Sequence, residues 1–174
     1  MISASDHAIA VYTGVFDPVH LGHLDVIRRG RRLVDKLIVG VGENPEKTPF
    51  FTSEERVQLL KQVTRDMANV EILPFTGLAV SFVSTVGARI ILRGIRTTSD
   101  MEYEFTMSLT NRAIDPEIET IFLMATETYA YLSGSLLRQI ATFGGELDKF
   151  VPPQVKDALL KRARERLQKQ VHNL

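Results

Sequence analysis

The segment Tyr12-Thr13-Gly14-Val15-Phe16-Asp17-Pro18-Val19-His20-Leu21-Gly22-His23 decides the fold, because it joins a strand, a glycine turn and the start of a helix. Residues 9–12 are typical of a short buried strand, which Gly14 ends. Apolar residues then recur at helical spacing and predict a helix from about Gly22; they are Leu24, Val26, Ile27, Leu33 and Val34. His20 and His23 therefore lie on the loop and first turn between a strand and a helix.

This placement of the two histidines favours phosphate binding. Backbone N–H groups and the helix dipole attract phosphate at a helix N-terminus, and α/β sheets bind ligands at the carboxyl ends of their strands. Gly22 lets a polyphosphate come close to the main chain, and an N–H-donating or protonated imidazole stabilises charge that develops on it. We therefore predict a nucleotide site at this turn.

Two histidines three residues apart also have other interpretations. They could ligate a metal, but the chain has no cysteine and no third ligand is obvious nearby in the sequence, so we predict no protein-bound metal. One of them could instead be a structural histidine held by hydrogen bonds. The strand–glycine–helix context is the one that a phosphate motif requires, and it favours the nucleotide site.

Composition limits the class of protein. The 174 residues fit a single domain, residues 1–174, in which 153–174 form a C-terminal helical extension. Equal numbers of basic and acidic residues, 21 each, give no overall field for nucleic acid or an anionic membrane, and neither is an expected partner. The absence of cysteine excludes disulfides and thiol catalysis. No leader pattern and no apolar run of about 18 residues occurs, so we expect a cytoplasmic protein.

Strand-like and helix-like segments alternate along the chain. Short β-branched runs occupy residues 37–41, 70–73, 89–92 and 118–123. Thr52-Ser53-Glu54-Glu55 is a capping box that opens a helix, and further helices are expected over 78–86, 101–113, 135–143 and 153–168. This order predicts an α/β fold with a doubly wound, mainly parallel sheet and right-handed crossovers.

Four motifs together resemble one enzyme family. They are Gly14-Val15-Phe16-Asp17-Pro18 with His20-Leu21-Gly22-His23, Arg93-Gly94-Ile95-Arg96, Glu102-Tyr103-Glu104 and Leu132-Ser133-Gly134-Ser135. In this order, with the loop Pro45-Glu46-Lys47, they resemble bacterial phosphopantetheine adenylyltransferases, which belong to the nucleotidyltransferase superfamily with an H-x-G-H motif and a Rossmann-like fold. The resemblance runs from about Ile9 to Pro152.

The resemblance implies a reaction. Members of this family transfer AMP from ATP to 4′-phosphopantetheine, with Mg²⁺, and form dephospho-coenzyme A and pyrophosphate; they are usually hexamers. Direct in-line attack on the α-phosphorus needs alignment and neutralisation of charge, and no covalent intermediate. Two alternatives remain: a nucleotidyltransferase for another phosphate-bearing acceptor, and a protein that binds nucleotide or coenzyme A without turnover.

The resemblance also implies which residues form the site. His23 would hydrogen-bond the α-phosphate in the transition state, with Lys47 and Arg96 as further catalytic residues. The residues expected at ATP are Val15, Phe16, His20, His23, Gly94, Ile95, Arg96, Glu104, Tyr129, Ala130, Tyr131, Leu132, Ser133, Gly134 and Ser135. The residues expected at 4′-phosphopantetheine are Val15, Lys47, Leu78, Ala79 and Arg93.

Each group of site residues has a structural alternative. The two arginines could form surface ion pairs with Asp100 or Glu102, and a loop lysine such as Lys47 is often only a solvated charge. Ser133 and Ser135 are natural helix N-caps, a role that is compatible with phosphate binding. Leu78 and Ala79, as apolar residues after a glycine, could belong to the core.

Two residues depart from the family pattern, and one run of charge stands apart from it. The family usually has threonine at Val15, where the hydroxyl contacts the substrate phosphate, and often has serine at Gly134. Thr13 does not replace that hydroxyl unless the strand pleat continues through Gly14. The basic run Lys161-Arg162-Ala163-Arg164-Glu165-Arg166 has no aromatic residue, so it favours a solvated helix face or a subunit contact over nucleic-acid binding.

Overall fold

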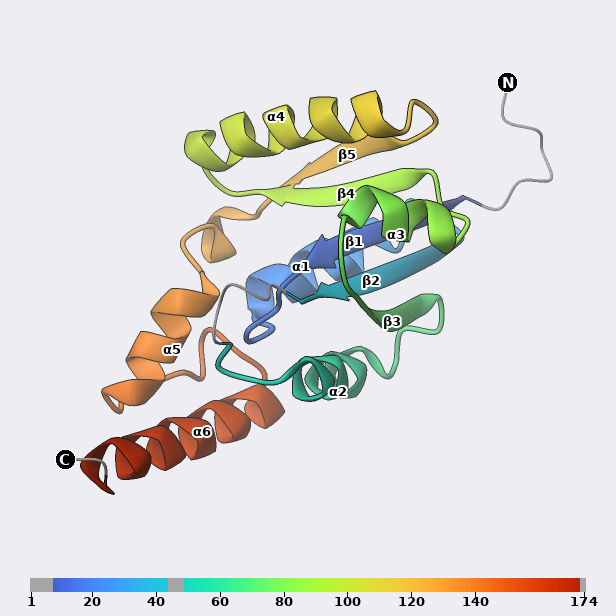
Figure 1. Ribbon diagram of the computed structural model, residues 1–174. Helices are drawn as coiled ribbons and strands as arrows, with labels where there is room; N and C mark the ends of the chain where they lie inside the picture. Colours follow the sequence, from blue (N-terminus) through green and yellow to red (C-terminus); the bar gives the residue numbers. More distant parts are fainter. Residues whose placement is uncertain (1–7, 44–48, 173–174) are drawn as a thin grey trace.

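The chain forms a five-stranded parallel sheet flanked by helices (Figure 1). The computed structural model describes residues 8–43 and 49–172. The strands are β1 (Ile9–Gly14), β2 (Lys36–Gly42), β3 (Val70–Phe75), β4 (Ile90–Ile95) and β5 (Glu119–Met124). Their spatial order is β3-β2-β1-β4-β5, and every neighbouring pair is parallel. The predicted doubly wound α/β fold is confirmed.

The helices alternate with the strands. They are α1 (Leu21–Gly30), α2 (Ser53–Thr64), α3 (Ala79–Thr85), α4 (Thr98–Ile114), α5 (Gly134–Thr142) and α6 (Pro153–His172), with a 3₁₀ turn η1 (Glu127–Tyr129). The capping box at α2 is present: Thr52 accepts from the Glu55 N–H, and Glu55 accepts from the Thr52 N–H. None of the described helices is long and apolar enough to cross a membrane.

Helix α1 is shorter than the apolar spacing predicts. It ends at Gly30, and Leu33 lies beyond it in a turn with its side chain 58% exposed. Gly30 packs so close to β4 that a Cβ there would stand 2.3 Å from a methyl carbon of Leu92. The chain then has to reach the start of β2 beside β1, where the Asp35 N–H bonds the Ala8 carbonyl, so Leu33 and Val34 cannot continue the helix.

The central strand β1 contributes to both faces of the sheet. Ala10 and Tyr12 pack into a cluster with α1, α2, α5 and α6, while Val11 packs into a smaller cluster with α3. This alternation follows from the two-residue period of a strand. Because β1 is buried on both faces and paired on both edges, the loop that follows it is anchored on a rigid element.

Helix α4 and the edge strand β5 differ from this core. No residue of α4 is buried, although Met101, Phe105 and Leu109 recur at a helical spacing. On β5, Phe122 and Met124 are exposed as well. This apolar face, made by α4 and β5, is uncovered in the single chain.

Candidate active site

The loop after β1 turns sharply beneath the site. Phe16 has a φ of +51°, in the left-handed region that non-glycine residues rarely adopt. Its ring is buried edge-on between Tyr12 (centroids 5.3 Å apart) and His23 (4.9 Å). Gly14 makes room for this ring, because a Cβ there would lie 2.9 Å from the Phe16 Cζ. The turn therefore brings the start of α1 over the carboxyl end of β1.

His20 and His23 cap α1 reciprocally. The Nδ1 of His20 accepts the His23 N–H at 3.3 Å, and the Nδ1 of His23 accepts the His20 N–H at 3.3 Å. Their rings stack with centroids 3.6 Å apart. This is the geometry of a capping box, in which imidazoles stand where serine or threonine and glutamate are usual. We call this pair the histidine box.

Burial favours the neutral form of both rings in the histidine box. Burial, with Arg96 nearby, lowers the pKa of His20 to about 3. Burial, together with His20, Arg96 and Arg93, lowers the pKa of His23 well below its usual range. Because each Nδ1 accepts a hydrogen bond, the single ring hydrogen of each neutral imidazole lies on Nε2. His20 is only 3% exposed and fits the structural alternative, whereas His23 lines a cleft.

Arg93 is held by Glu104, a residue that the family resemblance implies at ATP. Its guanidinium donates to both carboxylate oxygens of Glu104, with an Nε–Oε2 distance of 2.6 Å. It also donates to the Thr13 carbonyl at 2.5 Å and to the Thr13 hydroxyl at 3.1 Å. Thr13 is buried and committed to Arg93, so it does not replace the hydroxyl that Val15 lacks.

Arg96 joins two site segments. It forms an ion pair with Asp100 in the first turn of α4 (Nε–Oδ2 2.8 Å), the partner that the structural alternative named. It also donates to the Leu132 carbonyl at 2.7 Å, within the segment that precedes α5. Between the two arginines, Ile95 is buried and Gly94 lies against Val26, where a Cβ would be 3.0 Å from a methyl carbon.

The N-terminus of α5 faces the loop of β1. Ser133 is its N-cap and accepts the Leu136 N–H, whereas Ser135 lies inside the helix and is not a cap. The Gly134 departure has a physical reason, because a Cβ at that position would stand 2.8 Å from the Asp17 carbonyl oxygen. Arg138 donates to the same carbonyl.

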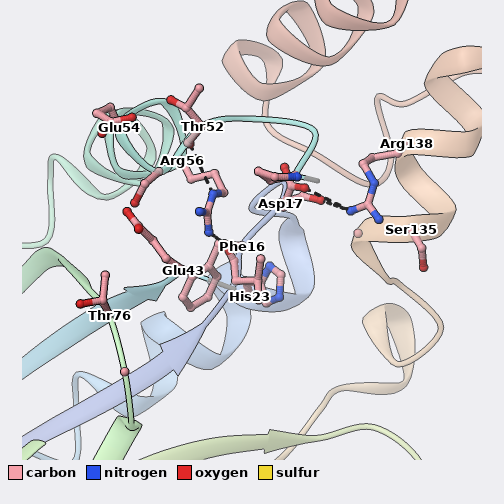
Figure 2. Close-up of a pocket in the computed structure, with 15 residues that line it drawn as sticks. Phe16, Asp17, His23, Glu43, Thr52, Glu54, Arg56, Thr76, Ser135 and Arg138 are labelled. Carbon is pink, nitrogen blue, oxygen red and sulfur yellow. Dashed lines mark hydrogen bonds and ion pairs between the residues drawn. The ribbon is translucent and has the colours of Figure 1, made fainter. Parts of the chain in front are cut away.

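A cleft of about 1180 Å³ lies over the carboxyl ends of β1 and β2 (Figure 2). Among the predicted site residues it collects Val15, Phe16, His23, Gly134 and Ser135. Val15 is 47% exposed. Thr76 and Gly77 line the cleft just before Leu78, which is 61% exposed, so the core alternative for Leu78 is wrong.

The other predicted residues lie outside this lining. Arg93 and Arg96 lie at the end of β4 and Glu104 lies on α4, while Leu132 is fully buried. Tyr129 and Ala130 are half-buried, and Tyr131 is exposed beside the Phe150 ring. Lys47 falls outside the residues that the structure describes.

The cleft also contains residues that the sequence did not single out. Arg56 is 3% exposed, and its guanidinium donates to the Val15 carbonyl at 2.7 Å, the Gly42 carbonyl at 2.9 Å and the Thr52 carbonyl at 3.3 Å. It ties the loop of β1 to the end of β2. Figure 2 shows Arg56 and Glu43 on one side of the cleft and Arg138 with Asp17 on the other. A signal for Arg56 was its spacing of three and four residues from Leu59 and Leu60, which puts it on the buried face of α2.

No described group of three histidine, aspartate or glutamate side chains could hold a metal ion. Asp17, three residues before His20, uses both carboxylate oxygens to accept backbone N–H groups. These residues do not fit a protein-bound metal. A divalent cation at this cleft would therefore arrive on the phosphates of a nucleotide.

Known proteins match this chain closely. Residues 11–140 match the cytidylyltransferase-like family model. A phosphopantetheine adenylyltransferase from Caldanaerobacter subterraneus subsp. tengcongensis is 51% identical over 154 residues, which cover 88% of this chain and 96% of the relative. Another phosphopantetheine adenylyltransferase, from Clostridium botulinum strain Eklund 17B, is 48% identical over 156 residues, which cover 90% and 98%.

Solved structures share the fold at low sequence identity. A bifunctional NMN adenylyltransferase/ADP ribose pyrophosphatase from Francisella tularensis aligns with a TM-score of 0.70 and 18% identity, over 90% of this chain and 49% of that one. A putative nicotinate-nucleotide adenylyltransferase from Vibrio parahaemolyticus aligns with a TM-score of 0.67 and 17% identity, over 89% and 99%. At such identities these structures support the fold alone.

Proposed function

The chain belongs to the phosphopantetheine adenylyltransferase family, and we propose that it transfers AMP from ATP to 4′-phosphopantetheine, giving dephospho-coenzyme A and pyrophosphate. It is a nucleotidyltransferase of coenzyme A biosynthesis. An oxygen of the acceptor phosphate attacks the α-phosphorus of ATP. The new P–O bond forms as the bond to the α–β bridging oxygen breaks, and pyrophosphate leaves with that electron pair.

The observation that carries the mechanism is the histidine box. The hydrogen bond at Nδ1 leaves His23 with its ring hydrogen on Nε2, on a residue that lines the cleft. A neutral Nε2–H donor suits this reaction, because the attacking phosphate is already an anion and no proton has to be removed from it. The Nε2–H of His23 would donate to an α-phosphate oxygen and stabilise the charge that develops there.

The cations are proposed to neutralise the crowded phosphates. Arg93 is assigned to the acceptor phosphate and Arg96 to ATP. Support for these roles comes from their fixed orientation, since Glu104 and Thr13 hold Arg93 while Asp100 and the Leu132 carbonyl hold Arg96. Lys47 is proposed to contact the acceptor phosphate. Mg²⁺ is proposed to enter as part of the substrate, Mg·ATP, since the described side chains form no metal site of their own.

The assembly is proposed to be a homo-oligomer, with the hexamer of the family as the expected state. The uncovered apolar face of α4 and β5 supports this, because exposed apolar patches of this kind often mark protein contacts. We also propose that the enzyme acts in the cytoplasm, since its proposed reaction consumes ATP.

The experiment that tests the function measures pyrophosphate release from Mg·ATP with and without 4′-phosphopantetheine. The proposal predicts that release depends on this acceptor and that dephospho-coenzyme A accumulates in equal amount. Release that requires nicotinate mononucleotide or another phosphate-bearing acceptor instead would reassign the substrate. Nucleotide binding without release of pyrophosphate would make the chain a binding protein.

A further inference from the structure

The short segment formed by residues 49–51 stands at the rim of the cleft, just before α2. One side of it is held by the loop of β1. The Asp17 carboxylate accepts the Phe50 N–H at 2.7 Å and the Phe51 N–H at 2.9 Å. Asp17 is buried, so these bonds are shielded from water and fix the backbone of the segment relative to the histidine box.

The other side of the same segment is held by α6. Arg162 donates to the Phe50 carbonyl at 2.7 Å, and its guanidinium carbon stands 5.2 Å from the centroid of the Phe51 ring. Arg166 donates to the Pro49 carbonyl at 2.5 Å and stands 4.5 Å from the centroid of the Phe50 ring. Both arginines thus combine a carbonyl contact with a cation–π contact. We call Asp17, Arg162 and Arg166 the clamp.

The clamp continues into the start of α2. Arg162 also pairs with Glu55, whose second carboxylate oxygen accepts the Thr52 N–H at 2.8 Å. Thr52 and Pro49 both line the cleft. A shift of α6 would therefore be transmitted to a wall of the cleft through a chain of directional hydrogen bonds.

The sequence of α6 indicates that these arginines do more than pack. The inner face of the helix is apolar at Val155, Leu159 and Ala163, all buried. Arginines then turn inward where the helix passes residues 49–51, although leucine would suffice for burial alone. Arginine holds a carbonyl in a defined direction, which an apolar side chain cannot do.

We propose that Arg162 and Arg166 are positioning residues for the phosphate-bearing acceptor, an inference that rests on the proposed function. The wall that they fix carries Pro49 and Thr52 and shares its cleft with Val15, Thr76 and Gly77. Val15, Leu78 and Ala79 are the described residues expected at the acceptor, apart from Arg93. Val15 is expected at ATP as well, and Phe16, His23, Gly134 and Ser135, also expected there, line the same cleft. Ser135, on α5, lies across the cleft from Thr52 and Thr76 (Figure 2).

Substitution of Arg166 tests this inference. Arg166→Leu keeps an apolar stem and removes the carbonyl and cation–π contacts. We expect the KM for 4′-phosphopantetheine to rise about five- to tenfold, because binding of the acceptor would then have to order residues 49–51, at a cost about equal to the lost hydrogen bond. The kcat and the KM for ATP stay within about twofold of the wild type. Arg166→Lys keeps the charge and is expected to restore part of the lost acceptor affinity.

A control on the same helix separates position from charge. Arg164 is exposed and stands beside a shallow cavity with Leu160 and Leu167. Arg164→Leu removes the same charge and should leave both KM values unchanged. The rate of amide hydrogen exchange at Phe50 and Phe51 measures how firmly the clamp holds residues 49–51, independently of enzyme activity. This exchange should become faster in Arg166→Leu and not in Arg164→Leu.

The outcomes are distinct. An unchanged KM for the acceptor in Arg166→Leu, with faster exchange or a lower Tm, would reduce the clamp to a structural contact and overturn the inference. An equal rise in both KM values would also overturn it. Failure of the proposed function would show in the wild type itself, which would then release no acceptor-dependent pyrophosphate.

Discussion

Two walls of the cleft are held in opposite ways. The histidine box is local: two residues three positions apart cap one helix and fix each other's rings. The clamp is long-range: Asp17 reaches a segment 33 and 34 residues away, and Arg166 reaches one 117 residues away. In the proposed mechanism the local device orients a hydrogen-bond donor toward the α-phosphate, whereas the long-range device is proposed to set the position of a wall. Rate and acceptor affinity should therefore respond to different substitutions.

The largest expected effect is on the chemical step. His23→Ala removes the Nε2–H donor, and kcat should fall about 10²- to 10³-fold, the usual cost of losing one donor to a developing oxyanion. The measurement is pyrophosphate release at saturating substrates, with circular dichroism to verify the fold. The KM for the acceptor should change little. A folded variant with unchanged kcat would show that His23 has no part in the chemical step. The histidine box and the clamp would then no longer differ in their effects on rate and on acceptor affinity.

The second effect concerns stability and pH. The unfolded chain binds a proton at His20 near its ordinary pKa of 6.5, while folded His20, with a pKa of about 3, stays neutral. Stability from this residue is therefore complete above pH 6.5 and is lost as the pH falls toward 3. Between pH 7 and pH 5 the loss is about 2 kcal/mol.

Denaturant unfolding of the wild type and of His20→Asn at pH 7 and pH 5 measures this loss. Asparagine is a good N-cap but does not titrate, so the variant should show the smaller fall in unfolding free energy. Identical falls in the two proteins would mean that His20 is not held neutral. The clamp arginine variants should leave the pH dependence unaltered, because arginine stays charged throughout this range.

The smallest effect is expected from substitution of Val15, which lies in the cleft between the histidine box and the clamp. Val15→Thr restores a hydroxyl in the cleft at a position that is already half-exposed. The KM for 4′-phosphopantetheine should fall by about three- to tenfold, as one added hydrogen bond would give, with kcat nearly constant. Initial rates at varied acceptor concentration measure it. If the KM does not move, the site has adapted to valine by other contacts.

What could be predicted from sequence follows the same division between local and distant contacts. The strands, the Thr52 capping box and the Ser133 N-cap depend on neighbouring residues, and all are present. The predicted end of α1 was wrong, because the packing of Gly30 on Leu92, which is far away in the chain, sets where the helix ends. Ser135 was wrong as a cap because the helix begins one residue earlier, at Gly134.

The candidate site shows the same limit. The H-x-G-H motif marked the histidines, but only the folded chain shows that each Nδ1 accepts a backbone N–H. The Asp100 partner of Arg96, four residues away, was named as the structural alternative and is present, whereas Glu104 as the partner of Arg93 was not foreseen. The basic run on α6 was visible in sequence, yet nothing local indicates that Arg162 and Arg166 face residues 49–51.

The central claim is that His23 is a neutral donor whose ring hydrogen lies on Nε2. Nitrogen-15 NMR of the histidine side chains tests it most directly, with His23→Gln to assign the signals. The account predicts a hydrogen on Nε2 and none on Nδ1 for His23, with no change between pH 7 and pH 5. A hydrogen on Nδ1, or titration of this ring within that range, would contradict it.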